Sequence, residues 1–299
     1  MTLSARPALA GPLAAMLIIA LPVAAWSGDG GSVLDHCTMK SAILGGERAY
    51  AVYLPPDYAT SSRSYPVLYL LHGSGDDQTG WVQFGEVLHI ADRAIADGSA
   101  TPMVIVMPDA NTGHRGYSNT IRGTWLYEDF FFKEFVPLVE KTYRIRAEKR
   151  YRAIAGLSMG GGGTFRYALH HPEMFSSACP LSASIRPLRL EDTRGSLSSF
   201  READTTGLSD AQVEAYFKRE SVLSLVENMP DSLLNAVRWY IDCGDKDRLS
   251  EGNCLVHNAM LRKGIPHEFR IREGAHTWTY WRASLPDVLR FVSDAFHQY

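Results

Sequence analysis

The sequence predicts an α/β fold in which a mostly parallel central sheet is flanked by helices. Short apolar runs typical of strands alternate with amphipathic runs typical of helices along most of the chain. Residues 65–71 and 103–107 are apolar throughout, as strands buried on both faces of a sheet are. A length of 299 residues is sufficient for one large domain with a well-buried core.

The composition is that of a globular protein, with 45% hydrophobic and 21% charged residues. The formal net charge is −3, and Lys and Arg form no dense run. Nothing therefore favours nucleic acid or an anionic membrane surface as a partner. A small neutral substrate is the expected ligand.

The first 25 residues differ from the rest of the chain. They include no acidic residue and a single Arg, Arg6, followed by an apolar segment at 13–25 that ends in small residues. This pattern predicts a cleaved signal peptide at 1–25, and an uncleaved anchor is the alternative. We therefore expect 26–299 to be a single catalytic domain, secreted or periplasmic, with no stable membrane association after cleavage.

The sequence contains an even number of cysteines, namely Cys37, Cys179, Cys243 and Cys254. In an oxidising compartment they could form one or two disulfides, although their pairing cannot be read from the sequence. The alternative is that Cys179 and Cys243 are small buried apolar residues. No cluster of His and Cys has the spacing of a zinc site, so no metal is predicted.

The remaining elements follow in order along the chain. A hairpin is expected over 37–54, with its turn at Gly45-Gly46. Between 185 and 235 polar helical segments replace the alternation of strands and helices, which indicates a helical insertion, either a cap over the site or a peripheral elaboration. Further strands are expected at 151–157, 178–181, 238–244 and 268–271, and helices at 81–95, 126–141, 164–170, 211–220 and 252–263.

The stretch Gly156-Leu157-Ser158-Met159-Gly160 follows an apolar strand and precedes a helical run. It fits the G-x-S-x-G pattern of a nucleophile elbow, in which glycines leave room for a sharp turn that exposes a serine hydroxyl. Ser158 is the candidate nucleophile, and the Met159 amide at the helix start is a candidate oxyanion donor. The alternative is a glycine-rich turn with an incidental serine.

An oxyanion hole needs a second amide, which in hydrolases with an elbow comes from the loop after an early strand. The loop 72–77 follows the strand at 65–71, and the N–H of Ser74 is the candidate. His72 has two interpretations. It is either a catalytic base or a structural histidine that holds this loop, and a histidine later in the chain favours the second.

His276 follows the last expected strand in a loop that begins with glycine. A serine hydroxyl is a poor nucleophile at neutral pH, so a histidine must accept its proton and a carboxylate must orient that histidine. Asp247 is the candidate carboxylate, with Asp242 and Asp245 nearby as alternatives. The chain order Ser158, Asp247, His276 is the order of the α/β-hydrolase fold.

Across residues 50–296 the sequence resembles the putative-esterase family of α/β-hydrolases, which includes esterase D, feruloyl and acetylxylan esterases, enterochelin esterase and the mycolyltransferases. It is most similar to the exported feruloyl esterase-like branch. In that family the acid stands three residues after the glycine of the late strand, which selects Asp247. Region 185–235 departs from the family pattern. The motifs that carry the resemblance are Val52-Tyr53-Leu54-Pro55, Leu70-Leu71-His72-Gly73 with Trp81, Arg152 to Gly161, Cys243-Gly244 followed by Asp247, and His276 followed by Trp278 and Trp281.

The resemblance implies a serine carboxylesterase that forms an acyl-enzyme and needs no cofactor. Its substrate would be a feruloyl or acetyl ester on plant cell-wall polysaccharide. Trp125, Trp278 and Trp281 could line the site of an aromatic acyl group, or could serve only in packing. The alternatives are an acyltransferase, a siderophore esterase or a peptidase with the same three residues and, less favoured, a non-catalytic carbohydrate-binding relative. The oligomeric state is not predicted.

Overall fold

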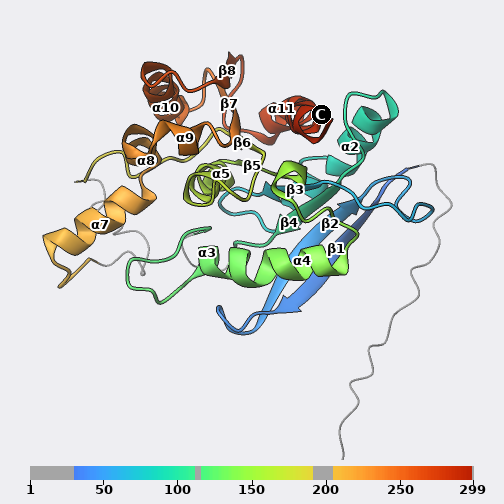
Figure 1. Ribbon diagram of the computed structural model, residues 1–299, viewed down its shortest axis with the longest axis horizontal. Coiled ribbons are helices and arrows are strands. Elements are labelled where there is room, and N and C mark those ends of the chain that lie inside the picture. The colour runs from blue at the N-terminus through green and yellow to red at the C-terminus, as the bar shows by residue number, and fades with distance from the viewer. Residues whose placement is uncertain (1–29, 112–115, 191–204, 298–299) are drawn as a thin grey trace, which may run out of the picture.

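The protein is described by a computed structural model that covers residues 30–111, 116–190 and 205–297 (Figure 1). The predicted signal peptide at 1–25 lies outside these residues. The described chain forms an eight-stranded sheet of order β1-β2-β4-β3-β5-β6-β7-β8, in which β1 pairs with β2 and β2 with β4 antiparallel, and all other pairs are parallel. The strands are β1 (Ser32–Lys40), β2 (Glu47–Leu54), β3 (Val67–Leu71), β4 (Val104–Pro108), β5 (Arg152–Leu157), β6 (Ser177–Leu181), β7 (Arg238–Gly244) and β8 (His267–Arg272).

Strands β3 and β4 are apolar throughout because each of their faces is covered by helices. Along β3, Tyr69 and its alternate neighbours belong to one hydrophobic cluster, whereas Leu68 and Leu70 belong to the cluster on the opposite face. Helices α1 (Gly80–Gln83), α2 (Val87–Ala96) and α11 (Trp278–His297) cover one face. The other carries α3 (Tyr127–Phe130), the π-helical turn Phe131–Phe135, α4 (Val136–Thr142), α5 (Met159–His170), α8 (Val222–Asn228) and α10 (Ser250–Arg262), and a 3₁₀ turn, Lys149–Tyr151, precedes β5.

Two helices differ from the sequence prediction. The helix expected over 81–95 is broken into α1 and α2. Between them the chain turns tightly over Trp81, and residue 85 must be glycine, since a Cβ there would come 2.5 Å from the indole. Glu86 then adopts a left-handed conformation with φ of 53°. The helix expected from 164 begins instead at Met159, so its run of glycines is helical. These glycines allow close packing, since a Cβ on Gly162 would lie 2.1 Å from the Ser184 carbonyl oxygen.

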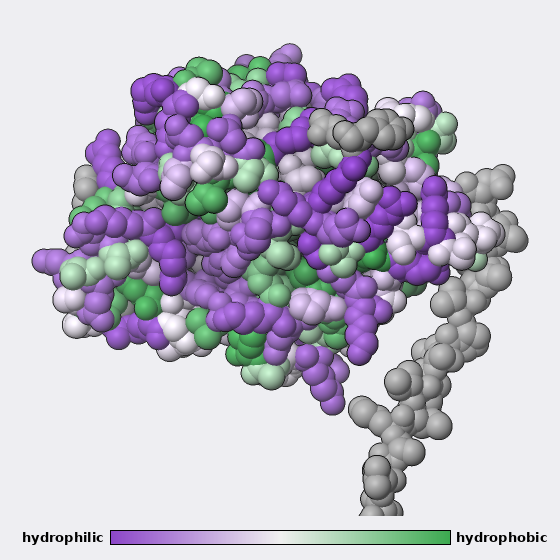
Figure 2. Space-filling model, viewed as in Figure 1, coloured by the Kyte–Doolittle hydropathy of each residue, from purple (hydrophilic) through white to green (hydrophobic). Residues whose placement is uncertain are grey.

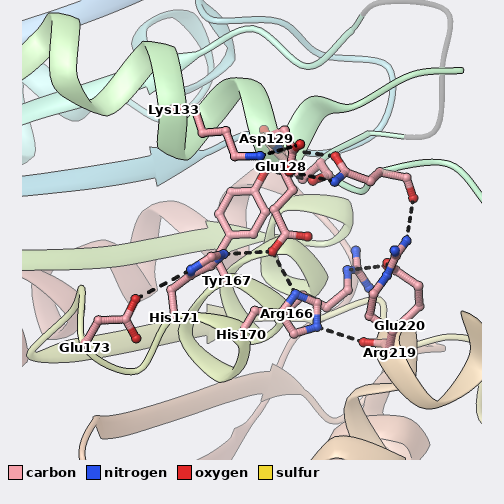
Figure 3. Close-up of polar contacts among 12 residues, drawn as sticks. Glu128, Asp129, Lys133, Arg166, Tyr167, His170, His171, Glu173, Arg219 and Glu220 are labelled. Carbon is pink, nitrogen blue, oxygen red and sulfur yellow. Dashed lines mark hydrogen bonds and ion pairs between the residues drawn. The ribbon is translucent and has the colours of Figure 1, made fainter. Parts of the chain in front are cut away.

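The described part of the insertion is helical, as predicted, and consists of α7 (Asp210–Glu220), α8 and α9 (Asp231–Leu234). A buried ionic network joins α7 to the body of the protein (Figure 3). Glu128 Oε1 of α3 lies 2.8 Å from His170 Nδ1 and 3.1 Å from His171 Nε2. The second ring nitrogen of His170 lies 2.8 Å from the Arg219 carbonyl oxygen. These bonds hold α7 against α5, while residues 191–204 of the insertion lie outside the described chain.

Several expected features can be examined in the part of the chain that the structure describes. All four cysteines are free thiols there, and Cys179 and Cys243 are buried as small apolar residues. No described helix is both long and apolar enough to cross a membrane. Within the same residues, no group of three His, Cys, Asp or Glu side chains is arranged to hold a metal.

Candidate active site

Ser158 occupies the sharp turn between β5 and α5. Its φ of 54° and ψ of −114° lie outside the regions that non-glycine residues ordinarily adopt, as expected for a nucleophile elbow. The flanking residues must be glycines, because a side chain at either position would collide with a backbone carbonyl oxygen of the turn or of the neighbouring loop. A Cβ on Gly156 would lie 2.7 Å from the Gly160 carbonyl oxygen, and one on Gly160 would lie 2.6 Å from that of His72. The residue is held by a bond from its own N–H to the Leu181 carbonyl at 2.9 Å.

The structure brings Ser158, His276 and Asp247 together at the carboxyl ends of β5, β7 and β8. His276 Nδ1 lies 2.7 Å from Asp247 Oδ2, and Nε2 lies 2.9 Å from Ser158 Oγ. Because an ionised carboxylate can only accept, the ring proton is on Nδ1, and the lone pair of Nε2 faces the serine hydroxyl. This arrangement can accept a proton from Ser158.

Asp247 is buried, with none of its side chain exposed. Burial alone would raise the pKa of this carboxyl, but hydrogen bonds from His276, from the Leu249 N–H and from the Ser182 hydroxyl outweigh that effect. The pKa of Asp247 is therefore lowered from its ordinary value, and the group is a carboxylate at neutral pH. A fixed negative charge beside the imidazole ring stabilises the imidazolium that forms when His276 accepts a proton.

The two alternative acids have other partners. Asp242 is fully buried in a cluster with Arg272, Tyr240 and Tyr280, whose hydroxyls and guanidinium donate to its carboxylate. Asp245 is exposed and accepts the Gly274 N–H at 2.9 Å, which fixes the loop that carries His276. Neither carboxylate contacts the histidine, so the geometry agrees with the choice of Asp247.

His72 is a structural residue by the same criterion. Its Nε2 accepts the Ala110 N–H at 2.8 Å, and its Nδ1 therefore carries the proton that is donated to the Gly73 carbonyl at 2.7 Å. Burial lowers its pKa, which favours this neutral ring. With both nitrogens bonded to backbone, His72 holds its loop against the elbow, where a Cβ on Gly73 would lie 2.6 Å from the Leu157 side chain.

The two amides expected to form an oxyanion hole belong to segments beside the serine. Met159 is the first residue of α5, so its N–H has no acceptor within the helix. Ser74 is exposed in the turn after β3, next to the glycine that approaches Ser158. Both amides thus belong to segments that border Ser158, and their roles as donors stay predictions.

The chain is similar to known esterases in sequence and in fold. The model of the Putative esterase family matches residues 41–292. The chain belongs to this family. An esterase of Mycobacterium tuberculosis strain H37Rv is 40% identical over 283 residues, covering 87% of this chain and 58% of its own length. The chain thus spans little more than half of that relative.

Other relatives of the putative-esterase chain carry more specific names. An endo-1,4-beta-xylanase/feruloyl esterase of Xylanibacter ruminicola is 36% identical over 262 residues, covering 84% of this chain and 30% of its own length. A solved ferulic acid esterase matches with a TM-score of 0.78 and 35% identity over 90% of this chain and all of its own. A serine hydrolase of Staphylococcus aureus, FphF, shares the fold at a TM-score of 0.72, with 21% identity over 88% of this chain and 99% of its own.

The three tryptophans expected to bind substrate have different surroundings. Trp278 packs edge-on against Trp81 with ring centres 5.2 Å apart and lies 5.9 Å from Phe84, which is 48% exposed. Trp281 is buried and meets the His276 ring edge-on at 4.9 Å. Trp125 lies in the hydrophobic core beneath the guanidinium of Arg48. Its packing does not favour a role in binding, whereas Trp278 and Phe84 form a partly exposed aromatic surface near the histidine.

Ser182, which the sequence analysis did not identify, completes the environment of the acid. It follows β6, is fully buried and has a φ of 43°. Its hydroxyl accepts the indole N–H of Trp281 at 3.0 Å and lies within hydrogen-bonding reach of Asp247. A short buried serine after a strand has no distinctive sequence pattern, so only the folded arrangement indicates this role.

Proposed function

We propose that the protein is a secreted serine carboxylesterase that hydrolyses feruloyl or acetyl esters on plant cell-wall polysaccharide through an acyl-enzyme. The observation that carries the chemistry is the hydrogen-bonded series from Ser158 Oγ through His276 to Asp247. The order of these three residues along the chain, and the position of Ser158 on a strained elbow, are typical of a nucleophile with its base and its orienting acid.

In the proposed mechanism, Ser158 Oγ attacks the ester carbonyl carbon as its proton passes to His276 Nε2. The resulting tetrahedral intermediate bears a negative oxygen, which the Met159 and Ser74 N–H groups would stabilise. Collapse breaks the bond to the alcohol, and the imidazolium returns the proton to that leaving oxygen. A water molecule, activated by the same histidine, then attacks the acyl-serine and releases the acid.

The proposed acyl group is supported by the relatives and by the aromatic surface. The names of the Xylanibacter and ferulic acid esterases describe those proteins, and the same chemistry is proposed for this one. Trp278 lies beside the exposed ring of Phe84, and offset contact with aromatic rings would favour a feruloyl over an acetyl group.

A substrate panel tests this proposal. Purified protein would be compared on methyl ferulate, acetylated xylan and short-chain aryl esters, with Ser158→Ala as the matched inactive control. We expect the highest kcat/KM on methyl ferulate. Hydrolysis of none of these esters, or equal hydrolysis by the Ser158→Ala variant, would contradict the proposed reaction, whereas a preference for acetylated xylan would retain the reaction and change the acyl group.

Export is a separate part of the proposal. The apolar segment at 13–25 supports cleavage after Ala25. Amino-terminal sequencing of the protein recovered from the culture medium or periplasm should begin at Trp26. Protein that keeps its first 25 residues and sediments with membranes would contradict this assignment.

A further inference from the structure

Strand β8 is the last strand of the sheet and, among the described residues, pairs only with β7. The Arg272 carbonyl accepts the Asp245 N–H on the β7 side. Since the backbone groups of successive residues point to opposite sides of a strand, those of His267, Phe269 and Ile271 point away from the sheet. The Phe269 carbonyl accordingly accepts the guanidinium of Arg270 at 3.3 Å rather than another strand. This edge can therefore pair with a further strand.

Two exposed aliphatic side chains lie on β8 and on α10, the helix that packs beside it. Ile271 of β8 is 42% exposed, and Leu261 of α10 is 57% exposed. Leu261 also lines an open hollow of about 640 Å³, together with Phe269 and His257, which stack at 4.1 Å, and with the charged pair Glu268 and Arg270. Small hydrophobic patches, set among hydrophilic residues, are visible along the top of the molecule, where α10 and β8 lie (Figure 2). Pairing at the edge would cover these side chains and gain hydrophobic stabilisation.

The charged residues of β8 favour a second copy of the same strand as the pairing partner. Glu268 and Arg270 share one face of the strand, where they form an exposed pair at 2.7 Å. In an antiparallel pair of two β8 strands centred on Phe269, Glu268 of each copy lies directly opposite Arg270 of the other. The outward backbone groups of Phe269 also face each other in this register. Moving the centre to Ile271 would instead place Arg270 opposite Arg272, so like charges disfavour it.

We propose that β8 is a homodimer interface, in which two copies of this chain join their sheets antiparallel about Phe269. Each Arg270 would exchange its own Glu268 for that of the second copy and release the Phe269 carbonyl for strand pairing. The alternative reading is that Arg270 blocks the edge, as charged side chains on edge strands often do. The two readings predict opposite results when the charges are reversed, because removing a blocking charge does not weaken an interface.

The test is a charge swap measured by sedimentation equilibrium over a roughly hundredfold range of protein concentration. We expect the purified protein to dimerise. Glu268→Arg should weaken the dimer about tenfold or more, and so should Arg270→Glu, because each variant places like charges opposite each other twice across the two-fold axis. The double variant Glu268→Arg/Arg270→Glu restores opposite charges in the same register, so its dissociation constant should return to within about threefold of the wild-type value.

Glu214→Lys on α7 is the matched control, since it changes an exposed acidic residue away from β8 and should leave the dimer unchanged. Thermal unfolding of each variant checks that the subunit itself is intact. A wild-type protein that stays monomeric throughout would overturn the proposal. So would a dimer that the single reversals leave unchanged, or one that the double variant fails to restore.

Discussion

Two buried carboxylate–histidine pairs in this protein have nearly the same geometry and opposite uses. Asp247 lies 2.7 Å from His276, and Glu128 lies 2.8 Å from His170. They differ in what meets the second ring nitrogen. Nε2 of His276 faces the hydroxyl of Ser158, which can donate a proton to it, whereas Nε2 of His170 faces a backbone carbonyl, which can only accept.

This difference determines the charge of the His170 ring. His170 has acceptors at both nitrogens and satisfies them only as an imidazolium. Burial opposes that charge, but the hydrogen bonds to Glu128 and the Arg219 carbonyl, together with the negative charges of Glu128 and Glu220, outweigh burial. The pKa of His170 is therefore raised above its ordinary value. Its carboxylate partner has a pKa lowered to about 2, since the two histidines outweigh the effect of burial. The pair on α5 is thus a fixed ionic anchor for α7, whereas the pair at the elbow keeps one nitrogen available for proton transfer.

Removing the proton donor that distinguishes the two pairs should have the largest effect. Ser158→Ala should lower kcat/KM for p-nitrophenyl acetate about 10⁵-fold, because the proposed nucleophile is lost. Its circular dichroism and melting temperature should match those of the wild type, since alanine keeps the Cβ at this turn. A variant with near-native activity would reject Ser158 as the nucleophile.

Neutralising the carboxylate tests the orienting role of the first pair. Asp247→Asn should reduce kcat about 10³- to 10⁴-fold, because an amide can donate to the ring and favour the wrong tautomer. Asp245→Asn is the matched control and should change kcat by less than about threefold, as that carboxylate bonds only the loop backbone. Initial-rate kinetics would compare them, and the reverse ranking would reassign the acid.

Breaking the second pair should affect stability rather than catalysis. Glu128→Gln should lower the free energy of unfolding by about 3 kcal/mol, since two histidines lose their acceptor, while kcat changes little. The raised pKa of His170 contributes stability that is complete below about pH 6.5 and is lost as pH rises through the pKa of His170 in the folded protein. The lowered pKa of Glu128 contributes stability that is complete above about pH 4.5 and is lost as pH falls towards 2.

The difference between wild type and Glu128→Gln should therefore be greatest between about pH 4.5 and 6.5. Urea unfolding at several pH values would measure it. Glu173→Gln, which changes an exposed carboxylate 3.6 Å from His171, is the control and should cost less than about 1 kcal/mol. An equal loss in both variants at every pH would show that Glu128 is not an ionic anchor.

The smallest effect is expected from the hydroxyl that supports Asp247. Ser182→Ala should reduce kcat about tenfold with little change in KM, because the carboxylate loses one donor while the substrate site is untouched. Trp281→Phe keeps a ring against His276 but removes the N–H that holds Ser182, and it should have a similar effect. In the double variant the two losses should not add. Fully additive losses would show that the two residues act separately.

The sequence predicted most of the strands of the central sheet, the elbow and the order of the candidate residues, because these features are local. Strands buried on both faces must be apolar, and a sharp turn at Ser158 requires glycine at 156 and 160. The break between α1 and α2 could not be predicted, since it lies at Glu86, a residue type that rarely adopts the left-handed conformation found there. Region 185–235 could be predicted as helical, but not how its helices are attached.

By itself, then, the sequence indicated a candidate nucleophile, base and acid and the kind of fold that holds them. The residue pattern left Asp242, Asp245 and Asp247 open, and the family resemblance selected Asp247. The tertiary structure supplies the physical reason, because Asp247 is the carboxylate that lies 2.7 Å from His276. It likewise separated His72, His170 and His276 into structural, anchoring and proton-accepting geometries. The physical reason is that the state of an imidazole is set by the two groups its nitrogens meet, and those groups come from segments far apart in the chain.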